Sequence, residues 1–174
     1  AHQLRYKYNM NPLTVTWAPL KYTKIGWENF QSLINSGLTN ILCTPNGKFN
    51  RKLARLCFEE LGDAFHIFVN GQISFPFQMA LKYDIPLVFY GENGELEYIG
   101  GDPKEKDRPF KPTEECVKLS YKGVTFDQLL SFGLKNKDYL TNNDFTHSDL
   151  NFYKIPSLES LKKKNILGHH YFSY

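Results

Sequence analysis

The sequence predicts a single α/β domain with a doubly wound parallel sheet and a helical C-terminal part. The chain has 174 residues, of which 41% are hydrophobic, and this suits one domain with a sizeable core. Strand and helix patterns alternate from residue 13 to residue 90, which indicates parallel strands joined by right-handed crossovers. Residues 86–90 form an unbroken apolar run without a helical or alternating period, as is typical of a parallel strand buried on both faces.

The alternating segments are defined by residue type and by the residues that stop them. Residues 13–17 (LTVTW) are rich in β-branched and aromatic side chains, which favour a strand. Apolar residues recur at helical spacing in residues 26–36 and 48–61, and Gly37 and Gly62 follow where a left-handed residue ends a helix. The predicted order is strand 13–17, helix 26–36, strand 40–44, helix 48–61, helix 76–83 and strand 85–90.

The first ten residues have the character of a helix end. Arg5 and Lys7 suit the carboxyl end of a helix, and Pro12 follows where a helix has stopped. A crossover helix that feeds a parallel strand normally follows an earlier strand, so we expect a strand and a turn upstream of Ala1. The closing ILGHHYFSY looks like a strand or an extended segment cut short, and we therefore expect the domain to be truncated at both ends.

The second half of the chain is expected to be mainly helical. Residues 101–112 are charged and rich in proline, which predicts a long loop that is either a lid or binding surface, or a solvated linker. Short helices are predicted at residues 113–121, after a capping box formed by Thr125 and Gln128, and after Ser157. We expect these helices to pack on the edge of the sheet.

Composition excludes several kinds of protein. No apolar stretch reaches the roughly 18 residues needed to span a bilayer, so we expect no membrane insertion, and cytoplasm is the default location. Cys43, Cys57 and Cys116 form neither a disulfide framework nor a metal knuckle. His169 and His170 have no acidic or cysteine neighbours at metal spacing, so we predict no metal site. A net charge of +3 is too small to argue for nucleic acid.

The strongest candidate for a site is the segment of residues 91–101, GENGELEYIGG, which follows the buried strand. Glycines such as Gly91 let the backbone turn sharply and approach a ligand. Glu92, Asn93 and Glu97 put acceptors and one amide at the carboxyl end of the strand, where ligands bind in open α/β sheets. A polar surface loop is the alternative, but the density of glycine and carboxylate favours a site.

A second candidate is the polar group Asn70, Gly71 and Gln72, between two apolar segments. We expect a turn here, followed by a helix with Pro76 in its first turn and Ser74 as its cap. The free N–H groups of that helix would face an anion, so phosphate or a sugar amide are the expected ligands. An ordinary turn into a helix explains these residues equally well.

Two motifs carry a resemblance to a known family. The run of residues 55–101, with NGQISFP and YGENGELEY, resembles the N-acetyl sugar amidotransferases of bacterial surface-glycan, lipopolysaccharide and pseudaminic or legionaminic acid biosynthesis. The similarity extends over nearly the whole chain, including LTVTW, TNILCTPN and LGHHYFSY. That family belongs to the PP-loop ATPases, so the resemblance implies a doubly wound sheet of the adenine-nucleotide α-hydrolase type.

The family's pyrophosphate signature, SGGxDS, would fall just ahead of Ala1 and does not occur in this sequence, nor does an amino-terminal cysteine cluster. The chain by itself is therefore expected to be inactive. The resemblance implies that the parent enzyme uses ATP and Mg²⁺ to convert a sugar N-acetyl group to an acetamidino group through an adenylated imidate. It also implies a free or nucleotide-linked N-acetyl sugar as substrate and a separate glutaminase that supplies ammonia.

The resemblance also suggests roles for residues of this chain. Glu92 and Glu97 would orient or deprotonate ammonia, or bind sugar hydroxyls, and Asn93 would hydrogen-bond to the amide or a phosphate. Gly91 would let the backbone approach the cofactor. The residues at the end of the first strand would line the adenosine pocket, as that position does in similar folds: Thr16, Trp17 and Ala18.

Two other functions fit the same fold. A PP-loop enzyme that adenylates a tRNA base would need a basic face and often has a cysteine pair; the small net charge and the lack of a CxxC motif argue against it. A non-catalytic module that senses adenine nucleotides would tolerate the loss of Glu92 or Glu97. We therefore expect small-molecule partners and no nucleic acid.

Overall fold

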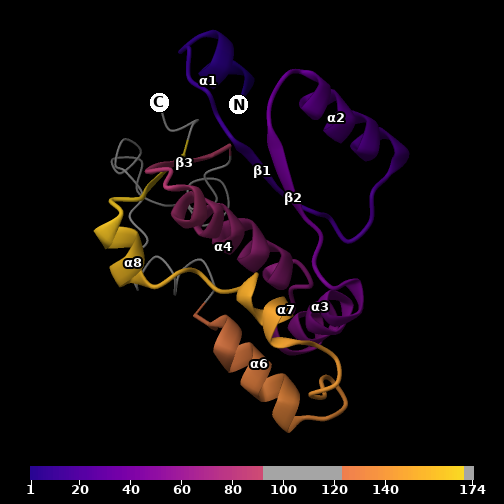
Figure 1. The fold of residues 1–174 in the computed structure, drawn as a ribbon. Helices are drawn as coiled ribbons and strands as arrows, with labels where there is room; N and C mark the ends of the chain where they lie inside the picture. The colour runs from indigo at the N-terminus through magenta and orange to yellow at the C-terminus, as the bar shows by residue number, and fades with distance from the viewer. Residues whose placement is uncertain (92–122, 171–174) are drawn as a thin grey trace.

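The computed structural model describes residues 1–91 and 123–170. In these residues the chain is a mixed α/β protein, with four short strands arranged as two separate parallel pairs (Figure 1). The expected segments at residues 92–122, which include the loop 101–112 and the helix 113–121, lie outside the described residues. None of the described helices is long and apolar enough to cross a membrane.

The first strand pair is built as the sequence predicts. Helix α1 (His2–Tyr6) precedes β1 (Thr14–Trp17), and helix α2 (Lys24–Asn35) connects β1 to β2 (Asn40–Cys43). The two strands pair in parallel, from Thr14 opposite Asn40 to Trp17 opposite Cys43. The amide of Asn40 donates hydrogen bonds of 2.9 Å to the hydroxyls of Thr14 and Thr16, and these bonds reinforce the register.

Helix α3 (Gly47–Leu61) follows β2 and carries much of the core. Gly62 ends it in the left-handed conformation, with φ of 70°, as its position predicts. The predicted apolar face is confirmed for Phe49, Leu53, Leu56 and Cys57, which are fully buried.

Helix α4 (His66–Tyr83) differs from the prediction. A turn at residues 70–72 and a helix starting near Pro76 were expected, but this is wrong, because α4 runs unbroken through both. Gly71 lies where the Trp17 ring packs, and a Cβ there would come within 2.1 Å of that ring. The tertiary contact with β1 therefore outweighs the low helix propensity of Gly71 and the break that Pro76 usually imposes.

The second strand pair lies beyond α4. Strand β3 (Leu87–Tyr90) pairs in parallel with β4 (Leu167–His170), from Leu87 opposite Leu167 to Tyr90 opposite His170. Both strands were predicted. The expectation that β3 is buried on both faces is wrong for the observed strand, because only Val88 is buried and the other residues of β3 are partly exposed.

In the part of the chain that the structure describes, three helices lie between β3 and β4 in the sequence. Helix α6 (Phe126–Lys135) begins at the predicted capping box of Thr125 and Gln128, and α8 (Leu158–Lys163) begins at Ser157, as predicted. Helix α7 (His147–Asn151) lies between them. The helical character of the C-terminal part is thus confirmed for the described residues.

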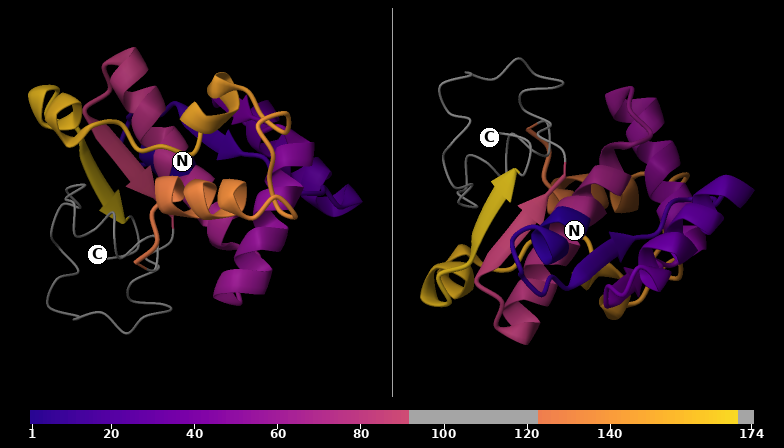
Figure 2. Two further views of the ribbon diagram at one scale, coloured as in Figure 1. Left: turned by 90° about the horizontal axis from the view of Figure 1, so that it is seen from below. Right: turned by 90° about the horizontal axis from the view of Figure 1, so that it is seen from above.

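The described residues form two apolar cores, and α4 contributes to both. The larger core joins β1, β2, α3 and α6 around Phe49 and Tyr153, and α4 adds Ile67 and Phe75 to it. The smaller core joins β3 and α8, and α4 adds Phe77. Seen from below and from above, β3 and β4 lie on one side of α4 and β1 lies on the other (Figure 2).

Candidate functional site

The predicted catalytic residues Glu92, Asn93 and Glu97 lie outside the described residues. The structure does describe Gly91, which directly follows the last residue of β3. Gly91 is exposed, and no atom lies within 4 Å of the place where a Cβ would be. Gly91 therefore lies in open space at the carboxyl end of a parallel strand.

The predicted adenosine-binding residues at the end of β1 are only partly open to a ligand. The Trp17 side chain is buried in the larger core, 5.3 Å from the Tyr153 ring and 6.1 Å from the Phe75 ring. Ala18 is also buried, and its N–H donates to the Cys43 carbonyl at 2.9 Å. Of the three predicted residues, only Thr16 retains partial exposure, so it and the strand-end backbone are what a nucleotide could contact.

The predicted substrate residues Asn70, Gly71 and Gln72 lie inside α4, so the expected helix N-terminus with free N–H groups is not there. Gln72 is exposed, whereas Asn70 and Gly71 are buried. Within the described residues, neither polar atom of the Asn70 side chain has a hydrogen-bond partner. An amide buried in that way costs about 1–3 kcal/mol, so Asn70 is an unusual core residue.

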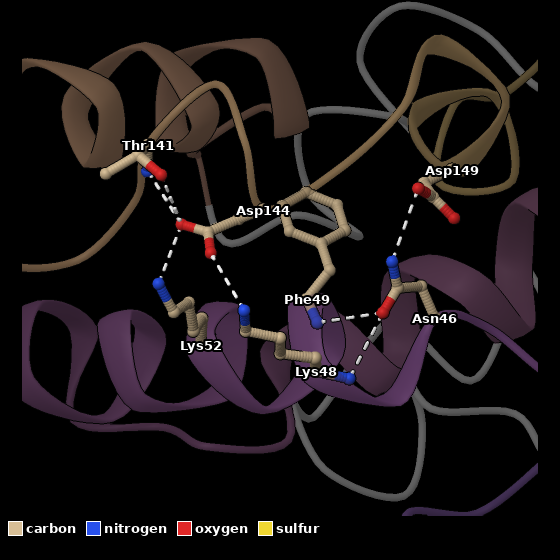
Figure 3. A network of polar contacts seen from close by, with 7 residues as sticks. All are labelled: Asn46, Lys48, Phe49, Lys52, Thr141, Asp144 and Asp149. Carbon is tan, nitrogen blue, oxygen red and sulfur yellow. Dashed lines mark hydrogen bonds and ion pairs between the residues drawn. The ribbon is translucent and has the colours of Figure 1, made fainter.

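Sequence reasoning missed the polar network where α3 begins, at the carboxyl edge of β1 and β2. Asn46 is the N-cap of α3, and its Oδ1 accepts from the N–H groups of Lys48 and Phe49 at 3.2 Å each (Figure 3). Its Nδ2 donates to Asp149 Oδ2 at 3.3 Å. The first turn of α3 is thereby joined to α7.

Asp144 is the centre of the same network. Its carboxylate accepts from Lys52 Nζ at 2.7 Å and from the Thr141 N–H at 2.8 Å, and Lys48 Nζ lies 3.9 Å away (Figure 3). The hydrogen bond from Lys52, together with those from Thr141, lowers the pKa of Asp144 to about 2. Asp144 is therefore ionised at neutral pH and fastens residues 141–149 to α3.

A sequence signal for this network existed. Thr141 with Asp144, and Thr146 with Asp149, are two copies of the Thr-x-x-Asp pattern that closes a turn by reciprocal hydrogen bonds. In each pair the carboxylate accepts from both the backbone N–H and the hydroxyl of the threonine. The pattern predicts the local turn but not the lysines on α3 that face it.

The edge formed by these elements is suited to an anion. Helix α3 has 15 residues, and its N-terminus carries partial positive charge at the carboxyl ends of β1 and β2. The Lys48 side chain is 70% exposed beside it. The carboxylates of Asp144 and Asp149 already balance part of that charge, so this edge attracts anions less strongly than an unpaired lysine cluster would.

The two cysteines that the structure describes are buried and unsuited to nucleophilic chemistry. Burial raises the pKa of the Cys43 thiol to about 11 and that of the Cys57 thiol to about 12. Both stay protonated at neutral pH. Within residues 1–91 and 123–170, no group of three or more His, Cys, Asp or Glu side chains could hold a metal ion.

A shallow hollow of about 420 Å³ lies against helix α6. Its wall contains none of the residues predicted to bind substrate or cofactor, and it comes from one helix: Asp127, Gln128, Ser131, Phe132 and Lys135. A surface hollow with a single wall offers little enclosure to a small molecule.

No family model matches the chain, and none of the curated proteins matches it either. The case for a function therefore rests on the motifs and on the geometry of the strand ends.

Proposed function

We propose that this chain is part of an ATP-dependent amidotransferase of the PP-loop class that converts a sugar N-acetyl group to an acetamidino group. One observation carries the proposal. Strand β3 ends at Tyr90, so the motif YGENGELEY begins at the carboxyl end of a parallel strand. That is where ligands bind in open α/β sheets. The two parallel pairs also support a doubly wound sheet of the adenine-nucleotide α-hydrolase type.

The proposed reaction has two steps. The oxygen of the sugar amide attacks the α-phosphorus of ATP, an O–P bond forms, and pyrophosphate leaves. Ammonia then adds to the imidate carbon, loses a proton to a base, and the C–O bond to AMP breaks. Activation is needed because an amide oxygen is a poor leaving group until it is phosphorylated.

We assign the base to Glu92 or Glu97, which follow Gly91 in the sequence after β3. Asn93 would donate a hydrogen bond to the sugar amide or a phosphate. The Mg²⁺ ion would be held by the phosphates of ATP. A separate glutaminase would supply ammonia, since none of the three cysteines has a convincing histidine partner in the sequence, and Cys43 and Cys57 are buried.

The test uses a polypeptide that carries an SGGxDS loop ahead of these residues. It is incubated with Mg-ATP, ammonium and N-acetyl sugars, either free or linked to a nucleotide, while AMP, pyrophosphate and the mass of the sugar are followed. We expect sugar-dependent AMP release together with conversion of the amide to the amidine. ATP binding without AMP release in the presence of any sugar would contradict the proposal.

Variants then separate chemistry from folding. We expect Glu92→Gln or Glu97→Gln to reduce turnover by about 10²–10⁴-fold, the usual contribution of a general base, without changing the unfolding midpoint. The matched control is Glu28→Gln on the exposed surface of α2, which should leave turnover unchanged. Equal activity in all three variants would remove both glutamates from the proposed chemistry.

A further inference from the structure

The outer edge of β2 is the side of that strand away from β1. Within residues 1–91 and 123–170, β2 pairs only with β1. Thr14 N–H donates to the Thr39 carbonyl and Ala18 N–H to the Cys43 carbonyl, each at 2.9 Å. Alternate residues of a strand direct their backbone groups to the same side, so the odd-numbered residues from 39 to 43 face β1.

The backbone N–H and C=O groups of Asn40 and Leu42 therefore point to the outer edge. In the part of the chain that the structure describes, none of these four groups has a hydrogen-bond partner. Edge strands in native proteins are usually protected from other chains by lysine, proline or a bulge. The four residues of β2, NILC, include no charge and no proline, and Leu42 is 37% exposed.

Helix α2, which connects β1 to β2, lies on the side of this strand pair away from α4 (Figure 1). It has 12 residues, none of which is buried. Gly26, Phe30 and Leu33 are half-buried and recur at helical spacing, so this side of the helix faces the strands. The rest of α2 contributes to neither of the two apolar cores.

One flank of α2 continues the outer edge of β2. Crossovers between parallel strands are right-handed, and with Phe30 toward the strands this places Trp27, Gln31 and Ile34 on the flank nearest that edge. Trp27 is 45% exposed and Ile34 is 37% exposed. Ile25 lies on the opposite flank. An unpaired strand edge and an exposed apolar helix flank therefore lie side by side.

We propose that a second copy of this chain pairs antiparallel with β2 along its outer edge, and that the α2 helices of the two copies pack against each other. In the two-fold register, Asn40 pairs with the partner's Leu42 and Leu42 with the partner's Asn40. Four hydrogen bonds then satisfy all four outward groups, and the half-buried Ile41 of each copy meets its counterpart on the axis. This inference does not rest on the proposed function.

The spacing of the elements fits a second copy. The two-fold axis of an antiparallel strand pair is perpendicular to the sheet, so both α2 helices lie on the same face and run antiparallel. The centres of the two strand pairs are two strand spacings apart, which is roughly 9–10 Å. Packed helices have an interaxial distance of about 8–10 Å. An antiparallel pair of α2 helices centred on Gln31 sets Trp27 against the partner's Ile34.

Charge and area also bear on this choice. A two-fold interface brings each charge near its own copy, so a self-complementary surface must be nearly neutral. Here β2 has no charge, and α2 has one lysine and one glutamate, Lys24 and Glu28. A four-residue strand and one helix flank offer less than the roughly 800 Å² per partner of a standard interface, so we expect a dissociation constant of about 1–100 µM.

The first test is sedimentation of residues 1–174 between about 1 µM and 1 mM, where the mass should rise from 20.3 kDa to twice that value. Leu42→Lys and Ile34→Lys each place like charges across the interface and should raise the Kd by about 100-fold or more. The matched control is Ile25→Lys, because Ile25 is 69% exposed on the opposite flank of α2. It should leave the Kd unchanged, and circular dichroism should show that all three variants are folded.

The second test is amide hydrogen exchange by NMR at low and high protein concentration. Exchange of the Asn40 and Leu42 amides should slow by about tenfold or more as the dimer forms. The Ile41 amide, which faces β1 in either state, is the internal reference.

A monomer at the highest concentration would overturn the inference. So would equal weakening by Ile25→Lys and Ile34→Lys, or exchange of Asn40 and Leu42 that does not depend on concentration, since either result would assign the dimer to another surface. The experiments contain no ATP or sugar, so failure of the proposed chemistry cannot produce these results.

Discussion

The two strand pairs differ in how much core supports them. The β1–β2 pair rests on the larger core, which includes Phe49, Tyr153 and the face of α3, and residues 141–149 are fastened to α3 by Asp144. The β3–β4 pair rests on the smaller core, to which α4 adds Phe77. The motif proposed to carry the chemistry follows β3. The site proposed at the end of β3 therefore belongs to the half of the molecule that has the smaller core.

The largest expected effect is in the larger core. Phe49 is fully buried, and its ring lies 4.8 Å from that of Phe145. Replacing it with alanine removes a large apolar surface and leaves a cavity, so Phe49→Ala should lower the free energy of unfolding by about 3–5 kcal/mol in urea. Phe58→Ala is the control, because Phe58 lies on the same helix and is 63% exposed. Similar losses in both variants would contradict the assignment of the core.

The equivalent substitution in the smaller core should lower the free energy of unfolding by less, and its effect should be confined to the elements around that core. Phe77 is fully buried, and the centroid of its ring lies 6.1 Å from that of Tyr90. Phe77→Ala should therefore lower the free energy of unfolding by about 3 kcal/mol. Hydrogen exchange should accelerate in β3, β4 and α8 while α3 and α6 stay protected. Phe65→Ala is the control, because Phe65 is the N-cap residue of the same helix and is 69% exposed. If Phe49→Ala and Phe77→Ala gave the same exchange pattern, the two halves would unfold as one unit.

A smaller effect is expected at the contact between the halves. Gly71→Ala forces a Cβ into the Trp17 ring. Because overpacking a core is destabilising, this substitution should lower the free energy of unfolding by about 2 kcal/mol. Gly91→Ala, which meets no atom, should change stability by less than about 0.5 kcal/mol. In a Trp17→Leu background the cost of Gly71→Ala should shrink. An unchanged cost would show that the ring does not set it.

The smallest effect is expected from Asp144→Asn, because asparagine keeps an oxygen that can accept from Thr141. The lowered pKa of Asp144 means that its carboxylate stabilises the fold above the unfolded-state pKa of about 4. That stabilisation is lost as the pH falls from about 4 to about 2. The unfolding midpoints of wild type and variant should therefore differ at pH 7 and converge over that range. A constant difference would assign the effect to packing instead.

The sequence predicts elements where a local residue fixes them. Gly62 stops α3 and the Thr125–Gln128 box starts α6 because both act through bonds within a few residues. The course of α4 depends instead on Trp17, a residue far away in the sequence. Gly71 and Pro76 therefore led to the wrong prediction of a turn and a new helix start. Local rules cannot express a contact of that kind.

The same distinction applies to the site. The end of β1 was correctly placed at a strand terminus, but a strand pattern does not say that the Trp17 side chain turns into the core. The network around Asp144 joins residues on α3 to the segment before α7, and only tertiary structure brings them together. The roles of Glu92, Asn93 and Glu97 stay predictions, since those residues lie beyond the described part.

The chain contains two tryptophans, and their surroundings differ: Trp17 is buried in the larger core, whereas Trp27 on α2 is 45% exposed. Their fluorescence is therefore a pair of natural optical probes. Emission from Trp17 should be blue-shifted and shielded from acrylamide, and emission from Trp27 should be red-shifted and readily quenched. Loosening of α2 and unfolding of the larger core can thus be distinguished by emission wavelength, without attaching a dye.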